Sequence, residues 1–373
     1  MRKKLIIISY DFPPLDGGIA RLCQEIASGQ ADFFDQVTVL TTDKAGESIT
    51  YNYTSVERIE FPSKRGRCEY AMIKYLRAIP NKSQYILLTA TWHPEGFIAL
   101  LSGFKNIYFL AHGTELLSGV SWFRKNVWLR FYAYLSLAKA NAVICNSSYT
   151  AGLVRSIQPR SHAISLPLAV NTDFFCPKNS VEIPSRGLRI ATVSRIEKFK
   201  GHDFIARTIA NLPINIRQGI HWNIAGKGPD LEYIKKLISE LKLDAQVTFW
   251  GFVADDQLPD FYNENDVFVL CSRESKDTIK VEGFGLVFLE AQACGIAAIG
   301  TRTGGIIDAI SHEHGGWLID QDNEQQLSGL LVRLSTDNGY LKEQRKLARE
   351  RVLNGFQWST YNNSLHHILT SRK

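Results

Sequence analysis

Two glutamates stand eight positions apart, and the first is followed at once by a glycine-rich turn. Glu282 precedes Gly283-Phe284-Gly285, and Glu290 lies in the apolar run Leu286–Cys294, which predicts a helix. Glycines let a backbone approach a ligand closely, and the N–H groups at a helix start attract anions. The stretch therefore predicts a seat for a diphosphate or for a row of sugar hydroxyls. The alternative is a glycine loop that caps a core helix, with Glu290 held in a salt bridge.

Cations and small turns follow three predicted strands earlier in the chain. Arg195 and Lys200 come just after the first of them, so both could face one anion, and a guanidinium suits a bidentate contact with phosphate. Gly226 begins a turn after the second strand, where a backbone can approach a ligand closely. Phe252 and Val253 follow the third, where a flat base could rest. Charged loops are usually only solvated, but several such loops at successive strand ends favour a site.

The first half contributes two further candidates. Gly17-Gly18 begins a predicted helix after the first strand, without the G-x-G-x-x-G spacing of a dinucleotide site, which disfavours a dehydrogenase. His112 follows a strand in Ala-His-Gly, at the edge where open α/β sheets bind ligands. A lone histidine is more often a structural residue, but its position and the following glycine favour a functional one.

The elements that must position these residues are strands alternating with helices. We predict strands at 5–8, 36–41, 85–89, 106–111, 142–146 and 163–166, and again at 188–194, 220–225, 246–250, 266–270, 296–300 and 317–319. A stretch rich in Pro, Asn, Ser and Gly between Pro167 and Arg189 predicts a linker. The fold class is therefore α/β, with two domains, a parallel sheet in each, and a cleft between them.

The bulk composition agrees with a soluble two-domain protein. The 373 residues are 45% hydrophobic and 21% charged, and no apolar run is long enough to span a membrane. Six scattered cysteines favour free thiols in a reducing cytoplasm, without a zinc site. Up to residue 180 there are 20 Lys and Arg against 13 Asp and Glu, whereas the remainder has 23 against 24. The first half is therefore expected to meet something anionic.

An aromatic and basic segment stands out in that first half. Residues 122–132 combine Trp, Phe and Tyr with Arg and Lys and predict a helix. Such a helix is typical of contact with an anionic membrane surface. A domain helix with aromatic core residues and solvated charges explains the pattern at least as well. A nucleic-acid partner is not expected, because no recognised binding motif accompanies the charge.

The order of these motifs resembles the family 4 retaining glycosyltransferases, which have the GT-B fold. The resemblance covers nearly the whole chain and is strongest from residue 188 to 320. Its most specific element is the E-x7-E pattern from Glu282 to Glu290, joined by Gly304-Gly305-Ile-Ile-Asp308. In the first half it includes Gly17-Gly18 and Asn146-Ser-Ser-Tyr-Thr. The chain is most similar to phosphatidylinositol mannosyltransferases and enzymes of surface glycans.

This resemblance implies a role for each matching residue. Catalytic roles fall to His112, Arg195, Lys200 and Glu282, with Arg195 and Lys200 on the donor's diphosphate. Glu290 would take the ribose hydroxyls. The donor-binding set is Gly17, Gly18, Gly226, Phe252, Val253, Gly283, Phe284, Gly285, Leu286 and Glu290. No metal or other cofactor is implied, because the Arg–Lys pair supplies the positive charge. One departure is the segment 271–280, which is longer than the family's usual link before the first glutamate.

The resemblance also implies an architecture and an activity. Domains are expected at 1–175 (acceptor), 188–355 (nucleotide sugar) and 356–373, a helix crossing back to the first. The expected reaction transfers a hexose from GDP-mannose, or else from a UDP-sugar, to a glycan or lipid-linked acceptor in surface polysaccharide or glycolipid synthesis. The protein would be cytoplasmic, with peripheral contact at the inner face of the plasma membrane. A nucleotide-sugar epimerase of the same fold and a catalytically silent scaffold subunit are the alternatives.

Overall fold

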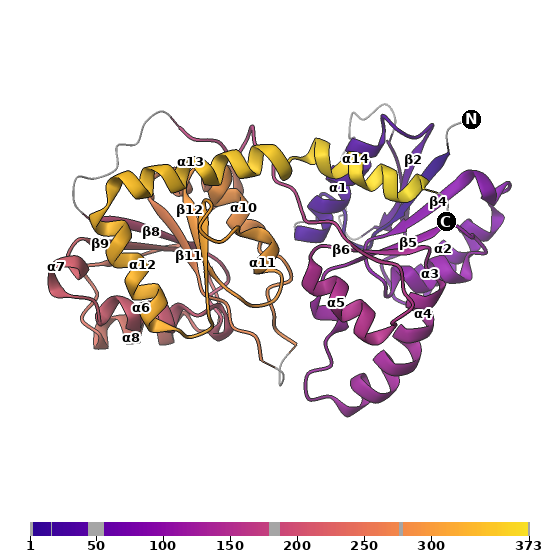
Figure 1. Ribbon diagram of the computed structural model, residues 1–373. Helices are drawn as coiled ribbons and strands as arrows, with labels where there is room; N and C mark the ends of the chain where they lie inside the picture. Colours follow the sequence, from indigo (N-terminus) through magenta and orange to yellow (C-terminus); the bar gives the residue numbers. More distant parts are fainter. Residues whose placement is uncertain (1–2, 16, 44–55, 179–186, 276–278, 372–373) are drawn as a thin grey trace. The chain divides into compact units, whose positions relative to one another are not determined.

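The computed structural model describes residues 3–15, 17–43, 56–178, 187–275 and 279–371, and it divides the chain into two compact units (Figure 1). Unit 1 is Met1–Leu166 with Trp358–Lys373, and unit 2 is Pro167–Gln357. Residues 167–175, which we assigned to the first domain, therefore pack with the second. The hydrogen bond from Val170 N to Phe356 O, 2.9 Å long, shows why, because it ties this segment to the end of unit 2.

Seven parallel strands form the sheet of unit 1, in the order β3-β2-β1-β4-β5-β6-β7. The strands are β1 (Lys4–Ile8), β2 (Val37–Thr42), β3 (Val56–Phe61), β4 (Tyr85–Thr89), β5 (Ile107–Ala111), β6 (Ala142–Cys145) and β7 (Ala163–Ser165). The inner strands are continuous apolar runs because helices cover both faces of a parallel sheet. The sequence predicted all of them except β3.

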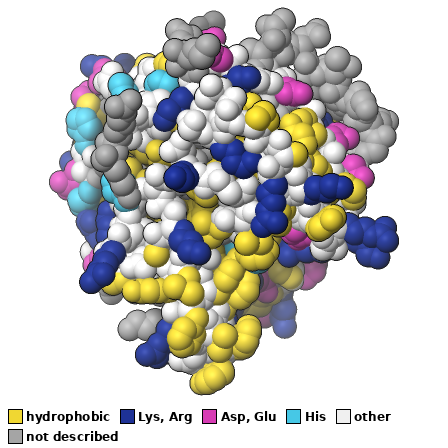
Figure 2. All heavy atoms as spheres, turned by 90° about the vertical axis from the view of Figure 1, so that its right-hand side faces the viewer, with side chains coloured by type: hydrophobic (Ala, Val, Ile, Leu, Met, Phe, Trp, Pro, Cys, Tyr) yellow, Lys and Arg dark blue, Asp and Glu magenta, His cyan; other side chains and the backbone are white. Residues whose placement is uncertain are grey.

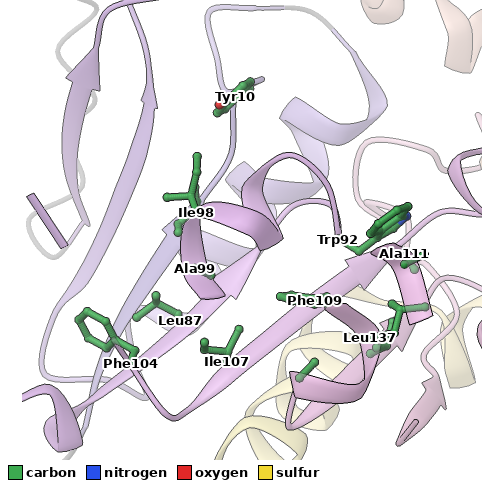
Figure 3. Close-up of a cluster of buried hydrophobic side chains, with 14 of the residues drawn as sticks. Tyr10, Leu87, Trp92, Ile98, Ala99, Phe104, Ile107, Phe109, Ala111 and Leu137 are labelled. Carbon is green, nitrogen blue, oxygen red and sulfur yellow. The ribbon is translucent and has the colours of Figure 1, made fainter. Parts of the chain in front are cut away.

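Helices pack on the two sides of this sheet (Figure 1). They are α1 (Gly18–Gln30), α2 (Arg67–Ala78), α3 (Glu95–Leu101), the π-type helix η3 (Arg124–Ala133), α4 (Tyr134–Lys139), α5 (Ser148–Ile157) and α14 (Trp358–Thr370), with short turns η1 (Lys82–Gln84) and η2 (Thr114–Leu116). Figure 3 shows part of the core, in which Phe109 of β5 and Leu87 of β4 lie under Ile98 of α3. The predicted aromatic helix is thus present as η3.

Helix α14 belongs to unit 1 because it packs on α1. The Gln30 amide donates to the Asn362 backbone and side-chain oxygens at 2.8 and 3.0 Å. A Cβ at Gly29 would lie 2.1 Å from the Asn362 amide nitrogen, so glycine allows this close approach. The Phe33 ring stacks on His366 with centroids 4.5 Å apart.

Unit 2 has a six-stranded parallel sheet in the order β10-β9-β8-β11-β12-β13. Its strands are β8 (Leu188–Val193), β9 (Ile220–Ala225), β10 (Val247–Gly251), β11 (Val267–Leu270), β12 (Ala297–Thr301) and β13 (Gly316–Ile319). Its helices are α6 (His202–Ala210), α7 (Ile214–Arg217), α8 (Leu231–Glu240), α9 (Leu258–Asn263), α10 (Leu286–Ala293), α11 (Ile306–Ala309), α12 (Glu324–Thr336) and α13 (Asn338–Gly355), with short turns η4 (Lys198–Lys200) and η5 (Asp255–Gln257).

The two sheets confirm the predicted α/β class. All six cysteines are free, and five of them are buried. Across the described ranges, no helix combines the length and apolar character that a membrane crossing requires. The loops after β8, β9, β10 and β11 all leave the carboxyl edge of the unit 2 sheet, because its strands are parallel. That edge holds most of the residues predicted for the site.

Candidate donor-binding site

The glycine turn before α10 is held in one shape by a second glycine pair. Gly285 caps the helix at φ 88°, a left-handed conformation that favours glycine. The Gly305 N–H donates to Glu282 O at 2.8 Å, and a Cβ at Gly305 would lie 2.0 Å from Gly283 O. Gly305 must therefore lack a side chain for the Glu282 loop to lie where it does. The first N–H groups of α10, beginning with that of Leu286, have no carbonyl of a preceding helical turn to bond to.

Glu290 is buried one turn into α10 and has a hydroxyl partner. The Tyr262 hydroxyl of α9 donates to its Oε2 at 2.9 Å. Both residues are buried, at 8% and 0% exposure. Burial, followed by the nearby Glu290 carboxylate, raises the pKa of Tyr262 well above its usual value, so the phenol stays protonated and can donate. Tyr262 therefore helps to fix the orientation of the Glu290 carboxylate.

Three cations and two carboxylates form a cluster where η4 meets the Glu282 loop. Lys200 Nζ lies 2.5 Å from Glu282 Oε2, and both side chains are largely buried. The buried Glu197 carboxylate accepts from two cations, Arg195 at 2.8 Å and Lys280 at 2.5 Å. The formal charge of this cluster is +1, three positive charges against two negative. Arg195 and Lys200 are thus each paired with a glutamate, and the cluster attracts an anion as a whole.

The aromatic ring of Phe199 lies among these cations. Lys200 Nζ is 5.0 Å and Lys280 Nζ 5.7 Å from its centroid, within the range of cation–π attraction. The hydrogen bond from Lys280, with the charge of Arg195, lowers the pKa of Glu197 against the opposing effect of burial. Glu197 therefore stays ionised and holds two cations together at one place.

A pocket of about 370 Å³ lies beside Arg195 at the carboxyl edge of β8, β9 and β10. Four of the predicted residues line it, namely Arg195, Gly226, Phe252 and Val253. Lys227 and Val287 also line it, and Lys227 Nζ lies 5.9 Å from the centre of the Phe252 ring. Its size and its apolar wall with a cation at the edge suit a nucleoside beside a phosphate.

Close backbone packing shapes the floor of this pocket. Gly226 has φ 141°, and a Cβ there would lie 1.9 Å from Ser194 O. A Cβ at Gly228 would lie 2.1 Å from Ile196 O. The loop after β9 thus lies directly against the loop that carries Arg195, which is possible only with glycines at both positions. The predicted close approach at Gly226 is to backbone of the same unit.

The candidates from the first half of the chain lie in unit 1. His112 follows β5, and its Nε2 lies 2.7 Å from Ala90 O. A carbonyl only accepts, so His112 Nε2 donates this hydrogen bond. The His112 backbone N–H donates to Glu115 Oε1 at 2.6 Å, which fixes the loop. Gly17 caps α1 and Gly18 is its first residue, so this helix start lies after β1 as predicted.

Comparison with known proteins decides the family. Residues 177–351 match the family described as Glycosyl transferases group 1, and residues 16–174 match the one described as Glycosyltransferase Family 4. The chain belongs to the family 4 glycosyltransferases. Together the two matches leave only residues 1–15, 175–176 and 352–373 unmatched.

Curated relatives of this glycosyltransferase include mannosyltransferases. The chain is 30% identical over 222 residues to the GDP-mannose-dependent alpha-(1-6)-phosphatidylinositol monomannoside mannosyltransferase of Mycobacterium tuberculosis, and the aligned region covers 57% of each protein. The enzyme of that name from Mycolicibacterium smegmatis is 24% identical over 99% of both chains. The putative colanic acid biosynthesis glycosyltransferase WcaL of Escherichia coli is 28% identical over 57% of this chain and 52% of its own length.

Solved structures show that the glycosyltransferase has the GT-B fold. Anabaena HepE, in complex with UDP, superposes with a TM-score of 0.77 and 18% identity, over 99% of this chain and 100% of that one. The sucrose-phosphate synthase of Thermosynechococcus elongatus superposes with a TM-score of 0.77 and 20% identity, over 98% of both chains. The predicted fold is confirmed.

Several residues of the glycosyltransferase site were not predicted from the sequence. Tyr262, Glu197, Lys280, Lys227 and Val287 contact or extend the predicted set. Their signal in the sequence is weak, since Lys280 and Glu197 are 83 positions apart. Lys280 follows a segment of which residues 276–278 are outside the described part. In the ranges that the structure describes, no three His, Cys, Asp or Glu side chains are grouped so that they could hold a metal ion.

Proposed function

We propose that this family 4 glycosyltransferase transfers a hexose from a nucleotide-diphosphate sugar to a glycan or lipid-linked acceptor, with retention of configuration and without a metal ion. The observation that carries the proposal is the pocket of about 370 Å³ next to the cluster of Arg195, Lys200 and Lys280. A nucleoside fits the pocket, and a diphosphate fits the cluster. This arrangement suits a nucleotide sugar better than a free sugar, because a free sugar has no nucleoside for the pocket and no diphosphate for the cation cluster.

In this proposal each predicted residue holds one part of the donor. The base lies against Phe252 and Val253, and Glu290, oriented by Tyr262, accepts hydrogen bonds from the ribose hydroxyls. The N–H groups at the start of α10 and the side chains of Arg195 and Lys200 hold the diphosphate. Glu282 and the backbone of Gly283 to Leu286 hold the transferred sugar.

The cations stabilise the charge that develops as the donor breaks. The bond between the sugar C1 and the diphosphate oxygen breaks, and its electron pair stays on the diphosphate, beside Arg195 and Lys200. The acceptor hydroxyl forms the new bond to C1 on the face just vacated, and its proton passes to the departing phosphate oxygen. This internal return retains the configuration without a covalent enzyme intermediate.

Residues of unit 1 complete the proposal. His112 would contact the transferred sugar and Gly18, with Gly17, would lie near the phosphates, as the family resemblance implies. Because His112 Nε2 donates to Ala90 O, Nδ1 is the ring nitrogen left to contact a sugar hydroxyl. The helix start at Gly18 can attract phosphate in the way that other helix N-termini do.

The donor and acceptor are proposed from the relatives and from the surface. The names of the mycobacterial relatives favour GDP-mannose, with UDP-sugars as the other donors to test. The name of the Escherichia coli relative favours an acceptor in surface-polysaccharide synthesis. Exposed side chains of Val120, Trp122 and Phe123 favour peripheral contact with an anionic membrane, at its cytoplasmic face.

Nucleotide binding tests the donor site. GDP at 100 times its dissociation constant should raise the melting temperature by about 5–10 °C, because only the folded protein binds it. UDP and ADP are measured in parallel, and the largest shift identifies the base. Phe252→Ala should weaken binding about fivefold, since stacking on an aromatic ring contributes about 1 kcal/mol. Tyr233→Ala removes an exposed ring on α8, away from the pocket, and should leave binding unchanged. If none of the three nucleotides raised the melting temperature, the proposal would be contradicted.

A further inference from the structure

One continuous part of unit 1 carries only positive charge. Between residues 116 and 166 the chain has no Asp or Glu, but it has six Lys and Arg residues. They are Arg124, Lys125, Arg130, Lys139, Arg155 and Arg160. The segment includes η3, α4 and α5, so the absence of acidic side chains coincides with a group of packed helices. Anionic ligands are attracted to such a surface and are not repelled at close range.

These helices enclose a large apolar groove. Its volume is about 860 Å³, and it lies between η3 with α4 on one side and the end of α5 on the other. Apolar side chains make most of its wall, namely Leu116, Leu129, Phe131, Leu135, Leu153 and Ile157. Phe131 and Leu135 are 60% and 59% exposed, which is unusual for such large apolar side chains. In Figure 2, hydrophobic side chains gather at the lower end of the visible face, with Lys and Arg side chains above them.

Two of the cations line the same groove. Lys125 and Arg130 are both exposed and belong to its wall. Arg124 differs, because its guanidinium donates to Leu117 O at 2.5 Å and Glu115 O at 2.8 Å and so fastens the loop before η3. Among the described residues, neither Lys125 nor Arg130 has a carboxylate partner. The groove is thus apolar and carries two cations that no acidic side chain of the described ranges neutralises.

We propose that this groove binds a phosphate-bearing lipid, with its hydrocarbon chain along Phe131 and Leu135 and its phosphate at Lys125 and Arg130. The chemistry of the wall supports one amphiphile over other occupants. An extended protein segment would bring polar backbone groups that this apolar wall cannot satisfy, and a free anion would leave the groove unfilled. The inference rests on the proposed function in one respect, because the lipid is then the carrier of the sugar acceptor.

The test uses a soluble probe and charge-matched variants of the full chain. Dodecyl phosphate, kept below its critical micelle concentration, should bind saturably at one site in equilibrium dialysis, whereas inorganic phosphate and dodecanol should bind at least tenfold more weakly. Lys125→Ala with Arg130→Ala should weaken dodecyl phosphate binding about 25-fold, at about fivefold for each cation. Lys139→Ala with Arg160→Ala removes the same charge from exposed positions outside the groove and should change binding less than twofold.

A second variant tests the apolar wall. Leu135→Asp places a carboxylate at an exposed position, so folding should persist, and it should abolish saturable binding. Equal loss in both charge-matched pairs would overturn the proposal, because binding would then follow net charge alone. Binding only to phosphatidylglycerol vesicles, with none to monomeric dodecyl phosphate, would show a membrane surface and no single-lipid site. Dimers in sedimentation that Leu135→Asp dissociates would show that a second copy covers the groove.

The donor site serves as the internal reference. GDP and UDP melting shifts are measured on each groove variant, and they should equal those of the unaltered chain. A groove variant that no longer binds dodecyl phosphate but keeps its nucleotide melting shifts would show that the lipid groove and the nucleotide site act independently. Intact lipid binding without any nucleotide shift would refute the proposed transfer reaction and leave the groove assignment standing.

Discussion

Replacement of Lys200 by methionine should impair both the fold and the reaction, by amounts that can be separated. Lys200 Nζ lies 2.5 Å from Glu282 Oε2, and the two side chains are 15% and 17% exposed. Exposed ion pairs contribute up to about 1 kcal/mol, and breaking buried ones costs about 3–5 kcal/mol. For this partly buried pair the free energy of unfolding should fall by about 1–2 kcal/mol, because Glu282 loses a partner while the methionine keeps most of the aliphatic contact.

The effect on turnover should be larger than the effect on stability. If Lys200 stabilises the departing diphosphate, its loss should reduce kcat by about 10²–10³-fold, as for removal of one donor to a developing charge. The Michaelis constant for the donor should rise much less. Turnover is measured as release of nucleoside diphosphate, and stability by urea denaturation.

Lys198→Met is the matched control for this substitution. Lys198 lies two residues away in the same turn η4, and its side chain is exposed. Its loss should leave kcat within about twofold and the free energy of unfolding within about 0.5 kcal/mol. A Lys200→Met enzyme with near-normal kcat, or a Lys198→Met enzyme equally impaired, would refute the role assigned to Lys200.

Three further predictions concern unit 2. Tyr262→Phe leaves Glu290 without its hydroxyl donor, so the free energy of unfolding should fall by about 1–3 kcal/mol in urea denaturation; no loss would contradict the hydrogen bond. Gly226→Ala brings a Cβ within 1.9 Å of a backbone oxygen and should destabilise by about 3 kcal/mol, whereas Gly329→Ala, in open space on α12, should not. Burial lowers the pKa of His202 to about 4, below the usual 6.5. Between about pH 6.5 and pH 4, the unfolded chain therefore binds a proton at this residue that the folded protein does not. The free energy of unfolding should therefore fall by about 3 kcal/mol as the pH falls from 7 to 4, and His202→Gln should remove that part of the loss. The same pH dependence in the variant would contradict a buried neutral histidine.

The sequence predicts the inner strands well because burial on both faces leaves a continuous apolar run. β4 and β9 begin and end at the predicted residues, Tyr85–Thr89 and Ile220–Ala225. β3 was missed because it is an edge strand whose sequence, Val-Glu-Arg-Ile-Glu-Phe, has charged residues at three of six positions and so lacks both a continuous apolar run and strict alternation. Only pairing with β2 identifies it as a strand, and pairing is not visible in a local pattern.

The site was predictable where one residue type is required at a fixed spacing. The eight-residue separation of Glu282 and Glu290 spans the glycine turn and the first turn of α10, and the glycines follow from close backbone contacts. The partners of these residues were not predictable. Tyr262 lies 28 positions from Glu290, and only the packing of α9 on α10 brings its hydroxyl to the carboxylate. Lys280 meets Glu197 because two loops leave the same sheet edge.

Transfer of the sugar to an acceptor can be followed in a single incubation. The chain is incubated with GDP-mannose or with UDP-sugars, in the presence and absence of a membrane extract, and nucleoside diphosphate and sugar products are both followed. We expect nucleoside diphosphate release that depends on the extract, together with a glycosylated product, and loss of both in the Arg195→Ala, Lys200→Ala double variant. Isomerised donor without an acceptor would instead identify an epimerase. No product with any donor, or undiminished release by the double variant, would contradict the account.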